Sequence, residues 1–363
     1  MESKQLDVQK IDKNMNIETG NKVELKWLSL KEKPFQLGGF PWFAKEHIYR
    51  RLPKSPKYPI SEEVDLLANC TAGGQIRFRT DSEKLFIRVK LSGIANMVHM
   101  PATGQCGFDF YVGIADKVFY CNTTRYDHTK AEYEIKLFEM KSKAWKNVVI
   151  NFPLYKGVEE VLIGVEETAG LEEPHSYTSD KRIIFYGTSV TQGGCASRPG
   201  MAYTNIISRR LNMEIFNLGF SGNGKGEPEV AQILTEIDKP ACLVLDYEGN
   251  CVSTELLSKT LTQFIEIYRK AHANVPILVV SRAPYAMERF NGELHRQRLE
   301  RKLLQKNTVE SFREMGDSHI YFYDGENLLG NDYEECTVDG VHPTDLGFLR
   351  MADNLEKALL GIL

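Results

Sequence analysis

The sequence predicts an antiparallel β-sandwich followed by an α/β domain that is built on a parallel sheet. The first half alternates apolar and polar residues with a period of two, which is typical of strands with one buried face. The second half holds short continuous apolar runs separated by segments of helical periodicity, which favours a parallel sheet covered by helices on both sides. A length of 363 residues suits two domains of ordinary size.

The strands expected in the first half are short. Residues 85–91 and 133–137 show the clearest alternation of apolar and polar side chains. Similar runs lie at residues 76–78, 108–112, 148–152 and 161–165, with Gly, Asn, Asp and Lys clusters between them. Many short strands separated by turn residues predict an antiparallel sandwich or jelly roll.

A polar segment without periodicity separates the two halves. It covers residues 166–181 and reads EETAGLEEPHSYTSDK. We therefore expect a β-sandwich domain over residues 1–178 and an α/β domain over residues 179–363.

The second half is expected to alternate strands and helices. Apolar runs lie at residues 183–186, 214–218, 242–247, 276–280 and 320–323, and helical patterns lie at residues 203–210, 256–268 and 351–360. Parallel sheets of this kind bind ligands at the carboxyl ends of their strands, so we searched for reactive side chains there.

Composition limits the classes of partner. The formal net charge is −4, and 26% of the residues are charged, with both signs interspersed. A basic patch for nucleic acid or for an anionic membrane surface is absent from the sequence. We therefore expect a small molecule or a neutral polymer as the partner, and the oligomeric state is left open.

The first twenty residues are polar, and no segment reaches the roughly 18 apolar residues of a membrane span. As written, the chain is expected to stay in the cytoplasm, whereas removal of a signal peptide would make it periplasmic or secreted. The seven cysteines show no CxxC pair, which argues against a zinc site and a redox dithiol. Buried free thiols are expected, and one disulfide is left open.

The first candidate motif is Gly187-Thr188-Ser189, directly after an apolar run. Gly187 would permit a tight turn that lifts the Ser189 hydroxyl out of the sheet. A plain loop with a capping Ser or Thr is the alternative. The nucleophile elbow G-x-S-x-G is not met, because Thr191 replaces its last glycine.

The second motif is a glycine-rich loop that runs from Gly219 to Gly226. It nearly matches a phosphate-binding loop, but Gly226 stands where the magnesium-binding Ser or Thr should be. There are two other interpretations of this loop: it donates an N–H group to an oxyanion, or it is a plain turn.

Two further motifs follow later apolar runs. Asn250 lies after residues 242–247, where its amide could donate a hydrogen bond, although Gly-Asn is also common in turns. Asp339 and His342 lie three residues apart before a helix, so that the carboxylate could orient the imidazole. Simple capping roles are the alternative.

Taken together, the four motifs resemble the conserved blocks of the SGNH (GDSL-like) hydrolases in order and context. Ser189 matches the block I serine, Gly222 the block II glycine, Asn250 the block III asparagine and His342 the block V histidine, with Asp339 in D-x-x-H. The resemblance covers about residues 181–363 and implies a flavodoxin-like three-layer domain. The β-rich first half resembles the accessory domain of some bacterial members.

The sequence departs from the family pattern at two positions. Thr188 replaces the Asp of G-D-S, and Cys251 replaces the final Asp of G-x-N-D. Neither change removes the serine, the histidine or the asparagine of the family's conserved blocks.

The resemblance implies a serine esterase. His342 would activate Ser189, Asp339 would orient His342, and Ser189, Gly222 and Asn250 would form the oxyanion hole, with no cofactor and no metal. The expected substrate is a short-chain acyl ester, in particular an O-acetyl group on carbohydrate. There are two alternatives: a carbohydrate-binding protein with a degenerate hydrolase domain, and a lipase or thioesterase. The hypothesis of a nucleotide-dependent phosphotransferase depends on the glycine-rich loop alone.

One polar and aromatic stretch has two interpretations. Residues 282–298 follow the fourth apolar run of the second half and read RAPYAMERFNGELHRQR. They would line the acyl or leaving-group side of the site, or they would form a solvated helix face.

Overall fold

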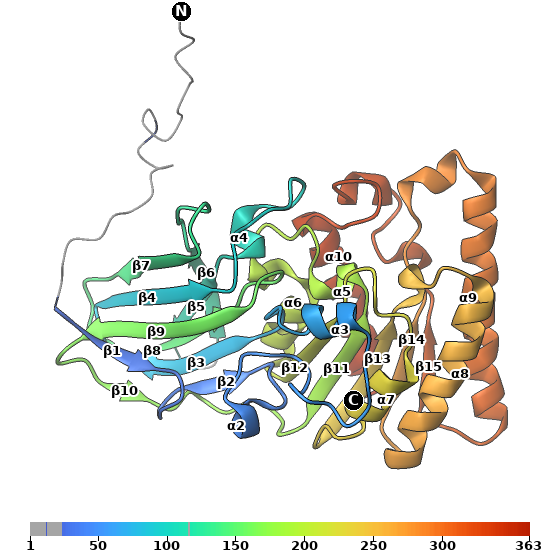
Figure 1. The fold of residues 1–363 in the computed structure, drawn as a ribbon, viewed down its shortest axis with the longest axis horizontal. Coiled ribbons are helices and arrows are strands. Elements are labelled where there is room, and N and C mark those ends of the chain that lie inside the picture. The colour runs from blue at the N-terminus through green and yellow to red at the C-terminus, as the bar shows by residue number, and fades with distance from the viewer. Residues whose placement is uncertain (1–11, 13–23, 115–116) are drawn as a thin grey trace, which may run out of the picture.

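The computed structural model describes residues 12, 24–114 and 117–363. The polar start of the chain, on which the expectation about export depends, lies almost entirely outside the described residues. Two antiparallel sheets are followed by an α/β layer structure, and the two parts lie side by side along the long axis of the molecule (Figure 1). The predicted fold class is therefore confirmed.

Two antiparallel sheets form the first part. One has the order β1-β9-β4-β7, and the other has the order β10-β3-β8-β5-β6 with β2 paired to β3. Side chains such as Ile87, Phe110 and Ile163 are fully buried between them. The strands are β1 (Leu25–Ser29), β2 (Gln36–Gly38), β3 (Gln75–Thr80), β4 (Lys84–Leu91), β5 (Asp109–Ile114), β6 (Lys117–Thr123), β7 (Glu132–Glu139), β8 (Lys146–Asn151), β9 (Val158–Glu166) and β10 (Leu171–Glu172).

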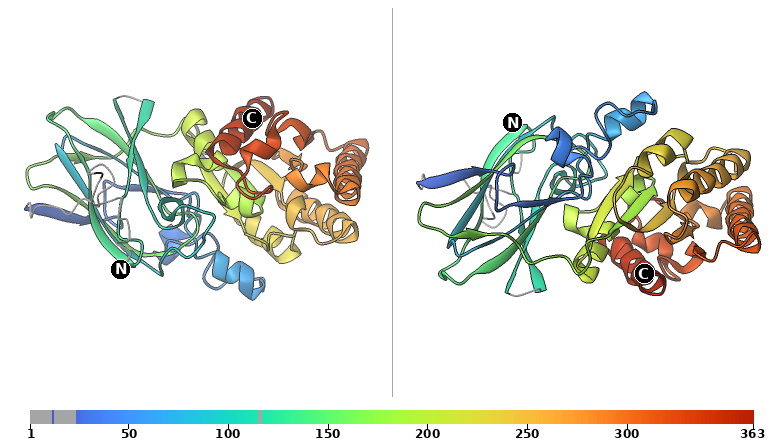
Figure 2. Two further views of the ribbon diagram at one scale, coloured as in Figure 1. Left: turned by 90° about the horizontal axis from the view of Figure 1, so that it is seen from above. Right: turned by 90° about the horizontal axis from the view of Figure 1, so that it is seen from below.

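Three short helices accompany these strands, namely α2 (Phe43–Glu46), α3 (Glu62–Leu67) and α4 (Ala102–Gln105). The segment between β2 and β3 does not pack on the sandwich alone. Its buried side chains Trp42, Leu52 and Val64 belong to the apolar core of the α/β part. Figures 1 and 2 show α3 lying against that part.

A five-stranded parallel sheet forms the centre of the second part. Its order β12-β11-β13-β14-β15 is that of flavodoxin-like folds, in which ligands bind where the strand order reverses, here between β11 and β13. The strands are β11 (Arg182–Gly187), β12 (Glu214–Gly219), β13 (Pro240–Asp246), β14 (Ile277–Val280) and β15 (Ile320–Tyr323). The helices are α5 (Ser189–Gln192), α6 (Tyr203–Leu211), α7 (Pro228–Leu234), α8 (Thr254–Ala271), α9 (Gly292–Glu314) and α10 (Asp345–Leu360).

Both faces of this sheet are buried. Ile184 and Tyr186 of β11 point into a core shared with α7, α8 and α9, and Ile183 and Phe185 point into a second core shared with α6 and α10. Burial on both faces explains why the strands appear in the sequence as continuous apolar runs.

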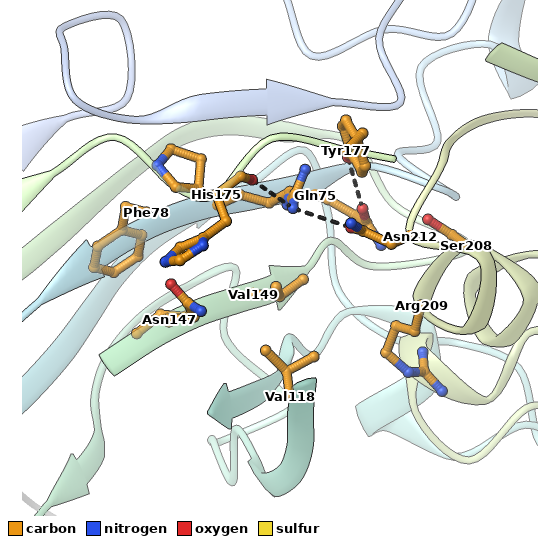
Figure 3. Close-up of a pocket in the computed structure, with 13 residues that line it drawn as sticks. Gln75, Phe78, Val118, Asn147, Val149, His175, Tyr177, Ser208, Arg209 and Asn212 are labelled. Atoms are coloured by element: carbon orange, nitrogen blue, oxygen red, sulfur yellow. Dashed lines mark hydrogen bonds between the residues drawn. The ribbon is translucent and has the colours of Figure 1, made fainter. Parts of the chain in front are cut away.

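The two parts meet through buried polar contacts. The Arg198 guanidinium lies 2.6 Å from Asp109 Oδ2, and the Gly200 N–H donates to the same oxygen at 2.9 Å. A cavity of about 40 Å³ also lies at this junction, lined by residues such as Gln75, Tyr177 and Asn212 (Figure 3). That volume holds a few water molecules and no sugar ring. The expected boundary near residue 178 lies between β10 and β11 and stays a prediction.

All seven cysteines are free thiols, of which Cys121 is exposed. In the part of the chain that the structure describes, no helix combines the length and the apolar composition needed to cross a membrane.

Candidate active site

Ser189 begins α5 at the carboxyl end of strand β11. A side chain at Gly187 would collide with Thr191 Oγ1 at 2.0 Å and with the Asp246 carbonyl oxygen at 2.6 Å, so close approach requires glycine there. Thr188 caps α5, because its hydroxyl accepts a hydrogen bond from the Val190 N–H at 3.2 Å. The chain therefore turns directly from β11 into α5 and presents Ser189 at the edge of the sheet.

His342 and Asp339 lie in a tight loop before α10. The His342 Nε2 atom lies 2.9 Å from Ser189 Oγ, and its Nδ1 atom lies 2.7 Å from Asp339 Oδ2. The other Asp339 oxygen accepts hydrogen bonds from the backbone N–H groups of Val341 and His342 at 3.0 and 2.8 Å. The structure thus brings together the three residues that the sequence nominated as a triad.

The charge of Asp339 determines how the imidazole is protonated. Burial alone would raise the pKa of Asp339, but hydrogen bonds from the His342 backbone and ring and from the Val341 backbone outweigh it and place this pKa below its usual value. An ionised carboxylate only accepts hydrogen bonds, so His342 carries its proton on Nδ1. The lone pair on Nε2 then faces the Ser189 hydroxyl, as a general base requires.

The glycine-rich loop follows β12, and most of its backbone N–H groups are already used. Among the described residues of the loop, Gly222 is the one whose backbone N–H donates to no acceptor in the protein. Gly222 has a φ of +69°, in the left-handed region that favours glycine. The loop N–H groups that do donate to protein acceptors are those of Ser221, Asn223, Gly224, Lys225 and Gly226. This pattern contradicts a phosphate cradle, which needs several free N–H groups, and is compatible with a single donor at Gly222.

Arg51 fixes the end of β12 from the other part of the molecule. Its fully buried guanidinium donates to the carbonyl oxygens of Gly219 at 2.6 Å, Asn217 at 3.1 Å and Cys70 at 2.7 Å. It also lies 4.9 Å from the centre of the Phe220 ring. Burial lowers the pKa of Arg51 to about 10, so the side chain stays charged at neutral pH. Arg51 therefore holds the start of the loop that carries Gly222.

Asn250 ends a 3₁₀ turn, Glu248–Asn250, that follows β13. Its side-chain amide donates one hydrogen bond to the Phe220 carbonyl oxygen at 3.1 Å, and an amide carries two N–H bonds. Glu248 anchors this turn, since its carboxylate accepts from the Arg282 N–H at 3.0 Å and from the Gln305 amide at 2.7 Å.

The stretch 282–298 is not a simple solvated face, and its Ala286 N–H donates to the Gly340 carbonyl oxygen at 2.9 Å, in the loop that carries Asp339 and His342. Its place on the acyl or leaving-group side stays a prediction. Arg282 and Arg298 are both buried, and each pairs with Glu288, at 2.6 and 2.7 Å. Met287 and Phe290 are exposed. The buried ion pairs link the Asn250 turn to α9. The stretch therefore connects both this turn and the loop of Asp339 and His342 to α9.

Sequence reasoning missed three residues near the site. Gln192 accepts a hydrogen bond from the Ser221 N–H at 3.0 Å, and its position one helical turn after Ser189 could have indicated it. Tyr155 lies with its hydroxyl 3.4 Å from Ser221 Oγ, and His99 has its ring centre 5.9 Å from that of His342. Both come from the β-rich half, and no local sequence pattern pointed to either.

Comparisons with known proteins agree with this geometry. A family model described as the GDSL-like lipase/acylhydrolase family matches residues 180–360, and a model described as the N-terminus of SGNH-hydrolase-type esterases matches residues 25–171. The chain is a GDSL-like hydrolase. No curated protein gives a significant sequence match.

Several solved structures share the fold of this GDSL-like hydrolase over both parts. A candidate GDSL-like lipase from Bacteroides ovatus is 28% identical with a TM-score of 0.86, and the match covers 94% of this chain and 99% of that one. A salicylyl-acyltransferase from a tetracycline biosynthetic pathway has 19% identity and a TM-score of 0.74, with coverages of 93% and 98%. An acetyl xylan esterase from the rumen bacterium Butyrivibrio proteoclasticus has 13% identity and a TM-score of 0.63, with the same coverages.

Family membership establishes the reaction class, because GDSL-like hydrolases are carboxylic ester hydrolases. The two departures from the family pattern leave the site assembled. Thr188 takes a capping role, and Cys251 is buried with its sulfur 3.9 Å from the Lys225 carbonyl oxygen. Pro343 precedes the cap of α10, which is Thr344, and lies outside the first helical turn.

Proposed function

We propose that this GDSL-like hydrolase removes short acyl groups, in particular O-acetyl groups, from carbohydrate. Ser189 is the nucleophile, His342 is the base, and Asp339 orients His342. The observation that carries the proposal is the continuous hydrogen-bonded line from Asp339 through His342 to Ser189, with spacings of 2.7 and 2.9 Å. Such spacings meet the requirement for proton transfer between neighbouring groups.

The reaction proceeds in two acyl-transfer steps. His342 Nε2 takes the Ser189 proton while Ser189 Oγ attacks the ester carbonyl carbon, and the imidazolium then gives that proton to the departing sugar oxygen. Water, deprotonated by His342, attacks the acyl-enzyme and releases the acid together with free Ser189. The backbone N–H groups of Ser189 and Gly222 and the second amide N–H of Asn250 hold the oxyanion in both steps.

The substrate class is supported by analogy with fold relatives. The acetyl xylan esterase and the carbohydrate esterases of family two from Clostridium thermocellum and Cellvibrio japonicus share this fold at 13–15% identity. These relatives are carbohydrate esterases, which agrees with a neutral polymer as the partner of a chain without a basic patch. The base is near the surface, since 24% of the His342 side chain is exposed, which supports access for a polymer.

Hydrolysis of p-nitrophenyl acetate and butyrate tests the chemistry. Wild type should release p-nitrophenol with a preference for acetate, and Ser189→Ala should lose turnover by about 10⁶-fold, as loss of a triad nucleophile does elsewhere. Ser258→Ala, which changes an exposed serine on α8, is the matched control and should keep full activity. Near-normal turnover by Ser189→Ala would contradict the assignment of the nucleophile.

Acetylated xylo-oligosaccharides test the substrate class. Serine-dependent acetate release from them, at a higher kcat/KM than from p-nitrophenyl acetate, is the expected result. Hydrolysis of long-chain esters or thioesters in preference to sugar acetates would favour the lipase or thioesterase alternative. Sugar binding without turnover of any ester would favour a degenerate, carbohydrate-binding protein.

A further inference from the structure

Three metal-ligating side chains lie together beside the proposed base. His99, Cys195 and His342 each offer one ligand atom, and these atoms all lie within 4.8 Å of one another. They come from three segments that are far apart in the sequence: the loop after β4, the loop after α5 and the loop before α10. The proposed hydrolysis uses His342 and leaves His99 and Cys195 without a role.

His342 is arranged as metal-binding histidines usually are. Its Nδ1 atom is held by Asp339 at 2.7 Å, which leaves the lone pair on Nε2 for a further partner. Histidines that bind metals commonly donate their other ring N–H to a carboxylate, which fixes the ring and strengthens the ligand. The same carboxylate and imidazole pair therefore serves a base and a metal ligand equally well.

The Cys195 thiol is held in one direction by its backbone. Cys195 has a φ of +73°, which is uncommon for a residue other than glycine. The turn is fixed on both sides, since the Gly194 N–H donates to the Ser189 carbonyl oxygen at 2.8 Å and the Ala196 N–H donates to the Gly193 carbonyl oxygen at 3.1 Å. Only 4% of Cys195 is exposed, and its sulfur lies within 4.8 Å of a ring nitrogen of His99 and of His342.

The loop that carries His99 is tied to the loop that carries Cys195. The Gln105 side chain accepts hydrogen bonds from the backbone N–H groups of Asn96 and Met97 at 2.9 and 3.0 Å, which shapes the His99 loop. Two residues before Gln105, the Thr103 hydroxyl donates to the Ser197 carbonyl oxygen at 2.6 Å. The backbones of the two loops are therefore preorganised, while the exposed His99 ring can turn.

The geometry and the ligand types point to one class of ion. Tetrahedral zinc with nitrogen at about 2.0–2.1 Å and sulfur at about 2.3 Å places its ligand atoms roughly 3.3–3.6 Å apart, so the three atoms, which lie within 4.8 Å of one another, would draw together by roughly 1.5 Å at most. Two imidazoles and a thiol select zinc and similar transition metals over magnesium or calcium. We propose that His99, Cys195 and His342 bind Zn²⁺ or a similar thiophilic divalent cation, with water in the fourth position.

Metal bound in this way turns hydrolysis off. The cation occupies the Nε2 lone pair of His342, which is then unable to take the Ser189 proton. This inhibition rests on the proposed role of His342 as the base, whereas the binding itself depends only on the three ligands. The β-rich half, through His99, thereby controls the chemistry of the other half.

A Co²⁺ titration of the full chain tests the binding without any use of activity. Wild type should develop the near-ultraviolet absorption of a cobalt–thiolate bond, and Cys195→Ser should lose it. Cys121→Ser, which removes the exposed thiol, is the matched control and should keep the band. A band that persists in Cys195→Ser would overturn the site.

The variant His99→Gln covers the case in which Cys195→Ser fails to fold, because His99 lies on the surface. It should weaken Co²⁺ binding at least about tenfold, because loss of even an outer partner of a metal ligand costs that much.

The effect of Zn²⁺ on p-nitrophenyl acetate turnover tests the inhibition. Micromolar Zn²⁺ should stop wild-type turnover and EDTA should restore it, whereas His99→Gln should need at least about tenfold more Zn²⁺ for half-inhibition. Equal Zn²⁺ sensitivity of the two proteins would overturn the proposal. A cobalt band that depends on Cys195 in a protein that hydrolyses no ester would support the metal site and refute the proposed function. Hydrolysis without a band or Zn²⁺ inhibition would refute the metal site alone.

Discussion

Asn250 has two tasks at the residue scale, because its amide has two N–H bonds. One holds the Phe220 carbonyl oxygen at 3.1 Å and so keeps the glycine-rich loop against the turn after β13. The other is the side-chain donor that we propose for the oxyanion. Loss of the side chain therefore affects both the position of Gly222 and the charge stabilisation in the transition state.

We predict that Asn250→Ala lowers kcat about 10²–10³-fold with little change in KM, because an oxyanion donor acts mainly in the transition state. Steady-state kinetics with p-nitrophenyl acetate measures the two constants. Urea unfolding of the same variant separates a lost donor from a loosened fold. A rise in KM at unchanged kcat would contradict the role in the oxyanion hole.

The sequence indicated those site residues that lie in short local motifs. Ser189, Gly222, Asn250 and the pair Asp339 and His342 each follow a strand or precede a helix, so that their place at one edge of the sheet followed from the order of elements. His99, Tyr155 and Arg51 reach the site from the β-rich half. Their contacts depend on how the two parts pack, and no periodicity or spacing encodes that packing.

At the scale of elements, Asp246 joins three of them at the end of β13. Its carboxylate accepts hydrogen bonds from the hydroxyls of Tyr203 on α6 at 2.9 Å and Thr191 on α5 at 3.2 Å. Burial, opposed in part by these two hydrogen bonds, raises the pKa of Asp246 to about 7. The folded protein therefore keeps a proton that the unfolded chain releases near pH 4.

This difference predicts a pH dependence of stability. Between about pH 4 and pH 7 the folded state binds more protons than the unfolded chain, so Asp246 makes the free energy of unfolding fall as the pH rises, by up to about 1.4 kcal/mol per pH unit. Asp246→Asn should remove this contribution, which urea unfolding at pH 5 and pH 7.5 would show as a smaller difference than in wild type. Asp238→Asn, an exposed carboxylate, should behave as wild type. Equal pH dependence in Asp246→Asn and wild type would contradict the buried proton.

Among the elements, the strands of the parallel sheet could be predicted from the sequence, whereas helix α9 could not. The strands of the parallel sheet are buried on both faces, and their apolar runs stand out in the sequence. Helix α9 (Gly292–Glu314) buries Arg298, Gln305 and Val309, two of which are polar. Arg298 is paired with Glu288 and Glu326 at 2.7 Å each, and this pairing replaces apolar contact on the buried side of the helix. A search for apolar periodicity therefore cannot find it.

At the scale of the whole molecule, the two parts are joined by a common apolar core and by an ion pair. Trp42, Leu52 and Val64 complete the core of the α/β part, and the buried Asp109 of the sandwich pairs with Arg198 of the α/β part. Isolated domains joined by a linker would show neither feature. We therefore expect the chain to unfold as one cooperative unit.

The placement of the tryptophans makes this expectation testable. All three, Trp27, Trp42 and Trp145, lie in the first half, whereas the long helices α8, α9 and α10 lie in the second. Because Trp42 packs into the core of the α/β part, fluorescence reports on both halves and far-ultraviolet ellipticity mainly on the second, so both signals should show one transition with the same urea midpoint. Asp109→Asn should lower both midpoints together, with a loss of about 1–3 kcal/mol in free energy of unfolding, since it leaves the partly buried Arg198 guanidinium without its charged partner. Midpoints that separate in wild type would show two independent domains.

The contact between Arg51 and the end of β12 also sets an order of events during synthesis. Arg51 and Gly219 are 168 residues apart in the sequence, so at roughly 5–20 residues per second the ribosome delivers the carbonyl partner about ten to thirty seconds after the guanidinium. During that interval the Arg51 guanidinium lacks two of its carbonyl acceptors, and the segment that carries Trp42 lacks the strands against which it packs. The first half therefore reaches its final form only when the second half emerges.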